Sequence, residues 1–140
     1  MVLSLAGCGM AEYDDISSDV KYAHLIGGQY QTLQRLRLHA VTLDRNSRKK
    51  IDIYNLTEYP GFGGPEVIYS RQLKPASLFQ IKTIIKCNNC IFDSRIKIVV
   101  DILSEDLDSE MPVHLPNMQV EDVAKRIILD PKFFRKIITE

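Results

Sequence analysis

Two cysteines three positions apart, Cys87 and Cys90, are the residues whose types and spacing most directly suggest chemistry. Such a pair can act as a redox centre, contribute to a zinc site or close a structural disulfide. Redox pairs of the thioredoxin type lie at a helix start, whereas strand-like residues flank this pair. Zinc needs four ligands, but His24, His39 and His114 stand singly and there is no second Cys-x-x-Cys. We therefore expect a structural disulfide in an exported protein and free thiols in a cytosolic one; redox or metal chemistry is the weaker alternative.

The sequence offers no nucleophile in a recognisable catalytic context. Ser70 and His39 could meet in space, but no Gly-x-Ser-x-Gly elbow or other motif links them. The glycine- and proline-rich segment 59–66 lacks the Gly-Lys-Ser/Thr ending of a phosphate-binding loop. We expect this segment to be a structural turn, with Phe62 either tucked inward or displayed as a contact residue. The protein is predicted to be non-enzymatic, without cofactor or metal.

The cysteine pair lies at the turn of a long β-hairpin predicted over residues 75–103. If Asn88 and Asn89 form a two-residue turn, Phe79 lies opposite Ile98, and the apolar residues of both strands fall on one face. A slip of one residue would place that apolar set opposite polar residues, so turn and pattern favour the same register.

Near the N-terminus, a third cysteine follows a short apolar segment. Leu5-Ala6-Gly7-Cys8 resembles the lipobox of bacterial lipoproteins. The resemblance implies that the Cys8 thiol carries a diacylglycerol and that Cys8 becomes the N-terminus after cleavage. No basic residue precedes the apolar segment, which is shorter than a secretory signal; a native start upstream of Met1 or a trimmed sequence would explain both departures.

This resemblance sets the expected organisation and location of the chain. Residues 1–7 would be the remnant of a signal peptide, residues 8–19 a tether, and residues 20–140 a single domain. By the same resemblance, Gly9 favours the periplasmic face of the outer membrane if the source is Gram-negative. The expected partners are the membrane, through the lipid, and an envelope protein.

Charge is uneven along a chain whose net charge is zero. Seven basic residues and one acid lie between Lys21 and Lys50, whereas seven acids and no basic residue lie between Asp101 and Asp122. Such asymmetry can steer a charged partner to one side of a protein. It supports an alternative function, a cytosolic small β-barrel that binds single-stranded nucleic acid. The residues of that surface would be Arg35, Arg37, His39 and Phe62, although zero net charge disfavours it.

Alternating apolar and polar residues predict further strands over 29–43, 50–57 and 66–69, with a bulge near Gln34. Two prolines interrupt residues 104–118, which we interpret as a linker. These elements predict a mainly β (α+β) fold: a small antiparallel curved sheet or a partly open barrel of the SH3-like or OB-like type.

A change of period near residue 119 predicts a C-terminal helical pair that covers the sheet. Apolar residues from Val120 to Ile128 recur at helical spacing, with acids early and basic residues late. Asp130 and Pro131 match the cap and first turn of a second helix. We therefore expect a small β domain with C-terminal helices, which works as a structural or binding module of the cell envelope.

Overall fold

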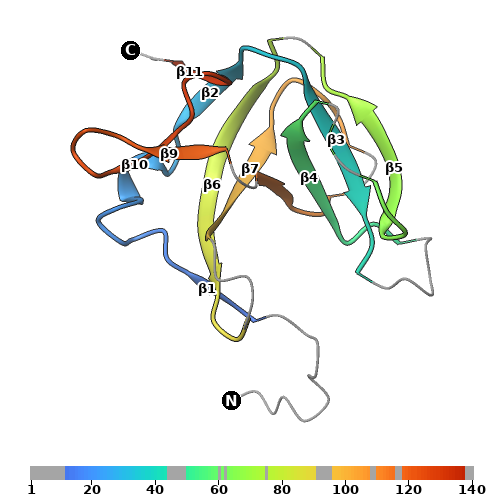
Figure 1. Ribbon diagram of the computed structural model, residues 1–140, viewed down its shortest axis with the longest axis horizontal. Coiled ribbons are helices and arrows are strands. Elements are labelled where there is room, and N and C mark those ends of the chain that lie inside the picture. Colours follow the sequence, from blue (N-terminus) through green and yellow to red (C-terminus); the bar gives the residue numbers. More distant parts are fainter. Residues whose placement is uncertain are drawn as a thin grey trace.

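Eleven strands and one short 3-10 helix make up the part of the chain that the structure describes, residues 12–43, 50–59, 61, 63–74, 76–90, 96–107, 110–115 and 118–137. The structure is a computed structural model, and Figure 1 shows its arrangement. The helix, η2, spans Ala23–Leu25. The strands are β1 (Tyr13–Asp15), β2 (Gln29–Thr32), β3 (Leu36–Val41), β4 (Ile53–Glu58), β5 (Val67–Gln72), β6 (Leu78–Cys87), β7 (Ile96–Ile102), β8 (Val113–Leu115), β9 (Gln119–Glu121), β10 (Ile127–Leu129) and β11 (Phe134–Ile137).

One nine-stranded sheet contains all strands except β9 and β10. Its order is β11-β2-β6-β7-β8-β4-β3-β5, and β1 pairs with the C-terminal end of β6. Every pairing in it is antiparallel except the one between β4 and β8. The sheet is curved and open, not closed into a barrel. The predicted mainly β fold is thus confirmed.

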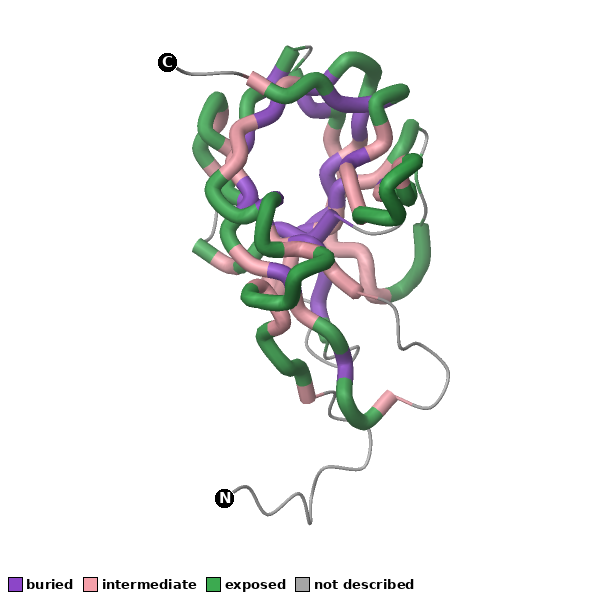
Figure 2. The backbone as a smooth tube through the Cα atoms, turned by 90° about the vertical axis from the view of Figure 1, so that its left-hand side faces the viewer, coloured by how far each residue is buried: buried purple, intermediate pink, exposed green. Residues whose placement is uncertain are grey.

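The concave side of the curved sheet holds the apolar core. Alternation in β3 places Leu36 and Leu38 inward, and Leu38 lies opposite Leu56 of β4. The aromatic ring of Phe79 stacks on Tyr30 at 5.9 Å and meets the edge of Phe134 at 5.3 Å. These contacts join the C-terminal strand to the centre of the sheet. In Figure 2 the buried stretches follow the curved part of the backbone.

The long hairpin is present as β6 and β7, but its predicted register is wrong. Phe79 lies opposite Ile102 instead of Ile98, so the connection between the strands is longer than two residues. A bulge follows Ile81, and the extra residue, Lys82, points outward, where its Nζ lies 3.6 Å from Asp101. After the bulge the phase changes and Ile84 is buried. The turn chemistry of Asn88-Asn89 therefore did not determine the register.

The predicted C-terminal helical pair is wrong. β9 and β10 form a separate antiparallel hairpin, in which Val120 lies opposite Ile128, and β11 joins the sheet beside β2. Oδ1 of Asp122 accepts hydrogen bonds from the backbone N–H groups of Ala124 and Arg126, both at 2.9 Å. A short polar side chain that satisfies the backbone in this way favours a turn over a helix.

Two further predictions change in the structure. The strand expected over residues 29–43 is interrupted at residues 33–35 and becomes β2 and β3. The linker expected over residues 104–118 contains β8, which enters the sheet between β7 and β4.

The described part of the expected tether, residues 12–19, lies against the sheet. Tyr13 to Asp15 pair with the last residues of β6, and the N–H of Ile16 donates to the carbonyl of Ile84 at 2.9 Å. The Ser17 hydroxyl accepts a hydrogen bond from the Ile84 N–H, also at 2.9 Å. Toward the N-terminal end of β6, Gly27 and Gly28 form backbone hydrogen bonds with Ile81, and β2 pairs with Leu78 to Gln80. Consecutive pieces of the N-terminal chain thus cover one edge of β6.

Candidate functional site

The cysteine pair lies at the end of β6, where β1 joins the sheet. The Cα atoms of Cys87 and Cys90 are 5.7 Å apart and their sulfur atoms lie at disulfide-bonding distance. The Asn89 side-chain oxygen accepts from the Glu12 N–H at 2.8 Å, and the Asn88 N–H donates to the Glu12 carbonyl at 2.9 Å. The cysteine pair therefore shapes the tip that follows β6, and this tip forms hydrogen bonds with Glu12, the first described residue of the domain. Cys8 lies outside the described residues.

The predicted basic surface is not assembled as one open face. Arg35 is exposed and its guanidinium lies over the Tyr59 ring, 5.3 Å from the centroid. Arg37 is half-buried and His39 has no exposed surface. Phe62 lies outside the described residues. Because His39 cannot reach a ligand on the surface, the expected groove of basic and stacking side chains loses its central member.

His39 instead joins three strands of the sheet. Its Nδ1 lies 2.6 Å from the Ser70 hydroxyl of β5, and its Nε2 lies 2.9 Å from the Thr57 hydroxyl of β4. Burial, with a smaller contribution from Arg37, lowers the pKa of His39 and favours the neutral ring. A serine beside a histidine can serve nucleophilic catalysis. Here both ring nitrogens lie at hydrogen-bonding distance from hydroxyl groups, and the ring is buried. The arrangement therefore links the strands β3, β4 and β5.

The glycine-rich segment 59–66 approaches this histidine. The backbone of Gly61 has a φ of +85°, and a Cβ at this position would meet the His39 ring and lie 2.7 Å from Oγ1 of Thr57. Gly61 thus packs against the histidine at a position that only glycine fits.

A second buried histidine, His114, lies in β8 between Asn55 of β4 and Val99 of β7. It is 6 % exposed, and its Nδ1 has no hydrogen-bond partner among the described residues. Burial, assisted by the nearby charge of Lys97, lowers its pKa to about 4. His114 is therefore a neutral member of the packed sheet at physiological pH.

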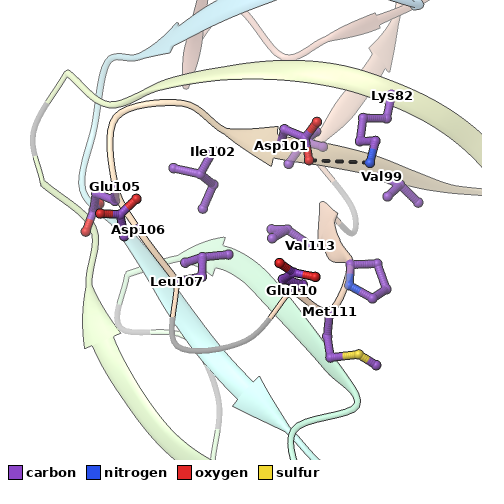
Figure 3. Close-up of a pocket in the computed structure, with 12 residues that line it drawn as sticks. Lys82, Val99, Asp101, Ile102, Glu105, Asp106, Leu107, Glu110, Met111 and Val113 are labelled. Carbon is purple, nitrogen blue, oxygen red and sulfur yellow. Dashed lines mark ion pairs between the residues drawn. The ribbon is translucent and has the colours of Figure 1, made fainter.

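A cleft of about 800 Å³ opens beside β7, and sequence analysis did not anticipate it. Figure 3 shows Ile102 and Leu107 pointing into the cleft, with the carboxylates of Asp106 and Glu110 to either side. The sequence signal for the cleft is the acidic run after Asp101, most of which falls in the predicted linker over residues 104–118. The cleft is lined by Lys82, Val99, Val100, Asp101, Ile102, Glu105, Asp106, Leu107, Glu110, Met111, Pro112 and Val113.

One wall of the cleft is fixed by buried polar contacts. The Glu105 carboxylate, 5 % exposed, accepts from the Arg71 guanidinium at 2.5 Å and from the Lys74 N–H at 3.2 Å. Burial opposes ionisation of Glu105, but these hydrogen bonds and the charge of Arg71 outweigh it and hold its pKa below the usual value. The Ser104 hydroxyl also accepts from the Leu78 N–H at 3.0 Å. The segment that forms the cleft is thus anchored to β5 and β6.

The charge of the cleft is predominantly negative. Asp101 pairs with Lys82, the single basic residue of the lining, and Glu105 pairs with Arg71. Asp106 and Glu110 form no ion pair with any described residue and are exposed. Two uncompensated carboxylates beside half-buried aliphatic side chains suit a ligand that is both cationic and apolar.

The described residues contain no group of three or more His, Cys, Asp or Glu side chains arranged to hold a metal ion. Within the same residues, no helix has the length and apolar content needed to cross a membrane. No protein-family model matches the chain, and no match is found among curated proteins or solved structures.

Proposed function

We propose that this chain is a non-enzymatic binding module of the bacterial cell envelope, held at a membrane by a lipid on Cys8. The lipobox-like Leu5-Ala6-Gly7-Cys8 motivates the anchor. The mature protein would face the periplasm from the outer membrane if the source is Gram-negative. Its open curved sheet would serve as a rigid scaffold, in the manner of partly open SH3-like or OB-like barrels.

The observation that carries this proposal is the separation between the chain entry and the cleft. The chain that follows Cys8 joins the domain at β1, beside the lower end of β6 in Figure 1. β7 begins near that end, with Ile96 opposite Lys86, and finishes at the cleft with Ile102 opposite Phe79. The cleft begins at Val99, three residues beyond Ile96, and extends to Ile102. At about 3.3 Å per residue of strand, it lies roughly 10 to 20 Å from the end that β1 joins. A lipid attached before β1 would therefore leave the cleft at some distance from the membrane surface.

The cysteine pair fits the same proposal. A disulfide between Cys87 and Cys90 would persist in an oxidising compartment and would stabilise the tip that receives Glu12. The tip lies beside β1, at the end of the domain that a lipid on Cys8 would hold nearest the membrane.

Metabolic labelling with a palmitate analogue tests the anchor in cells of the native host. The wild-type protein should incorporate the label and sediment with membranes, because acylation of Cys8 provides its attachment. The Cys8→Ser variant should lose both properties, whereas the variant with Cys87→Ser and Cys90→Ser should keep them. Equal labelling of wild type and Cys8→Ser would contradict the proposal.

A further inference from the structure

We infer that the cleft beside β7 binds an extended, basic peptide segment of a partner protein, in which lysine or arginine residues flank an aliphatic residue on one face of the peptide. This inference rests on the proposed role as a binding module but not on the lipid anchor.

The shape of the cleft supports a bound ligand. Its volume of about 800 Å³ lies within the range of roughly 300–1,000 Å³ that is usual for ligand sites. The side chains of Ile102, Leu107 and Met111 are half-buried around it, so each retains apolar surface that a ligand could cover. Because Glu105 and Ser104 fasten the wall, little ordering would be needed on binding.

The charges select the class of ligand. Lys82 offsets Asp101, and Arg71 offsets Glu105, whereas Asp106 and Glu110 form no ion pair with a described residue and can meet a partner. Figure 3 shows these two carboxylates on different sides of the aliphatic patch around Leu107. A ligand that meets both must carry more than one cation and an apolar part between them. An anionic ligand, such as nucleic acid, would be repelled.

A peptide satisfies this pattern better than a small amine. In an extended peptide every second side chain faces the same way, so a basic, an aliphatic and a basic residue at successive alternate positions can meet the rim and the patch together. A polyamine also carries cations separated by methylene groups, but its unbranched chain would cover less of the apolar patch than a leucine or isoleucine side chain.

Fluorescence anisotropy on the full-length, non-lipidated chain tests the inference. The probe is a fluorescein-labelled peptide with repeating Lys-Ser-Leu-Ser units (the Lys/Leu peptide), in which lysine and leucine share one face, compared with one in which serine replaces leucine (the Lys/Ser peptide). We expect the Lys/Leu peptide to bind and the Lys/Ser peptide to bind at least tenfold more weakly. The variant with Asp106→Asn and Glu110→Gln should weaken binding of the Lys/Leu peptide by about tenfold, since two exposed charge pairs are removed. Both substitutions are on exposed side chains, and unfolding curves will verify that the variant folds.

A matched variant controls for net charge. Glu58→Gln with Glu121→Gln makes the same change in charge at exposed positions outside the cleft and should leave the affinity within twofold of wild type. Equal loss in both double variants, equal binding of the two peptides, or no binding at all would each overturn the inference. Because no lipid is involved, these outcomes are independent of the labelling experiment on Cys8.

Discussion

Tyr13 lies directly opposite Cys87 in the antiparallel pair formed by β1 and β6. The first described residues of the chain are therefore hydrogen-bonded to the C-terminal end of β6, the longest strand. They cover an edge that would otherwise expose unpaired backbone groups. A chain anchored through Cys8 would thus be fastened to the domain within a few residues of its lipid. Several expected outcomes follow from this edge, from the two buried histidines and from the cysteine pair.

The Ser17 hydroxyl is expected to stabilise the edge of β6. Substitution Ser17→Ala leaves the Ile84 N–H without its acceptor and should lower the free energy of unfolding by about 1 kcal/mol. Urea denaturation measures this change. Ser18 is exposed, so Ser18→Ala should be nearly neutral. Equal stability of the two variants would show that the N-terminal segment does not seal the sheet.

Gly61 should be required for the close approach of the backbone to His39. Substitution Gly61→Ala places a Cβ against the His39 ring in a backbone conformation with positive φ, so it should cost about 2 kcal/mol of stability. Gly63→Ala is the matched control, because no atom lies within 4 Å of the added Cβ. Thermal unfolding of both variants should show a lower Tm for Gly61→Ala alone.

His114 should make stability depend on pH. Its pKa is about 4 in the folded protein and about 6.5 in the unfolded chain, so the unfolded state binds more protons between these values. The stabilising effect is complete above pH 6.5 and is lost as the pH falls toward 4. The loss should amount to about 3 kcal/mol, and the lowered pKa of His39 acts in the same direction.

Urea denaturation across this range measures the slope. His114→Leu should flatten the profile because leucine does not titrate. The substitution loses no hydrogen bond at Nδ1, which has no partner among the described residues. The wild-type chain, measured over the same pH range, is the reference. An unchanged slope in His114→Leu would assign the pH dependence elsewhere.

The two cysteines at the tip should be oxidised in protein prepared from an exported form. Thiol titration of the non-lipidated chain should then detect one thiol before reduction, that of Cys8, and three afterwards. Replacing Cys87 and Cys90 by serine should cost roughly 2 kcal/mol, because the closed loop is short. Three reactive thiols before reduction would contradict the structural disulfide.

The sequence predicted the elements whose patterns are local. Alternation located β3, β4 and β5, and the hairpin was recognisable as two long apolar stretches around a polar turn. Its register depended on the bulge after Ile81 and on a longer connection, which alternation alone does not encode. The C-terminal hairpin was mistaken for a helix because Val120 and Ile128 face one another across it, and a spacing of eight also fits two helical turns.

The functional surfaces were harder to predict than the strands. The period of two correctly placed Arg37 and His39 on the face opposite Leu38, but it could not show that neighbouring strands bury His39. The cleft depends on contacts between distant parts of the chain, such as Arg71 with Glu105. Only the acidic composition of its wall was visible in the sequence.

The most direct test of the account is the intact mass, with N-terminal peptide analysis, of the protein isolated from its native membrane fraction. The account predicts a mature chain that begins at Cys8 and carries the added mass of the lipid. A chain recovered in the soluble fraction, with residues 1–7 retained and Cys8 unmodified, would contradict the envelope anchor.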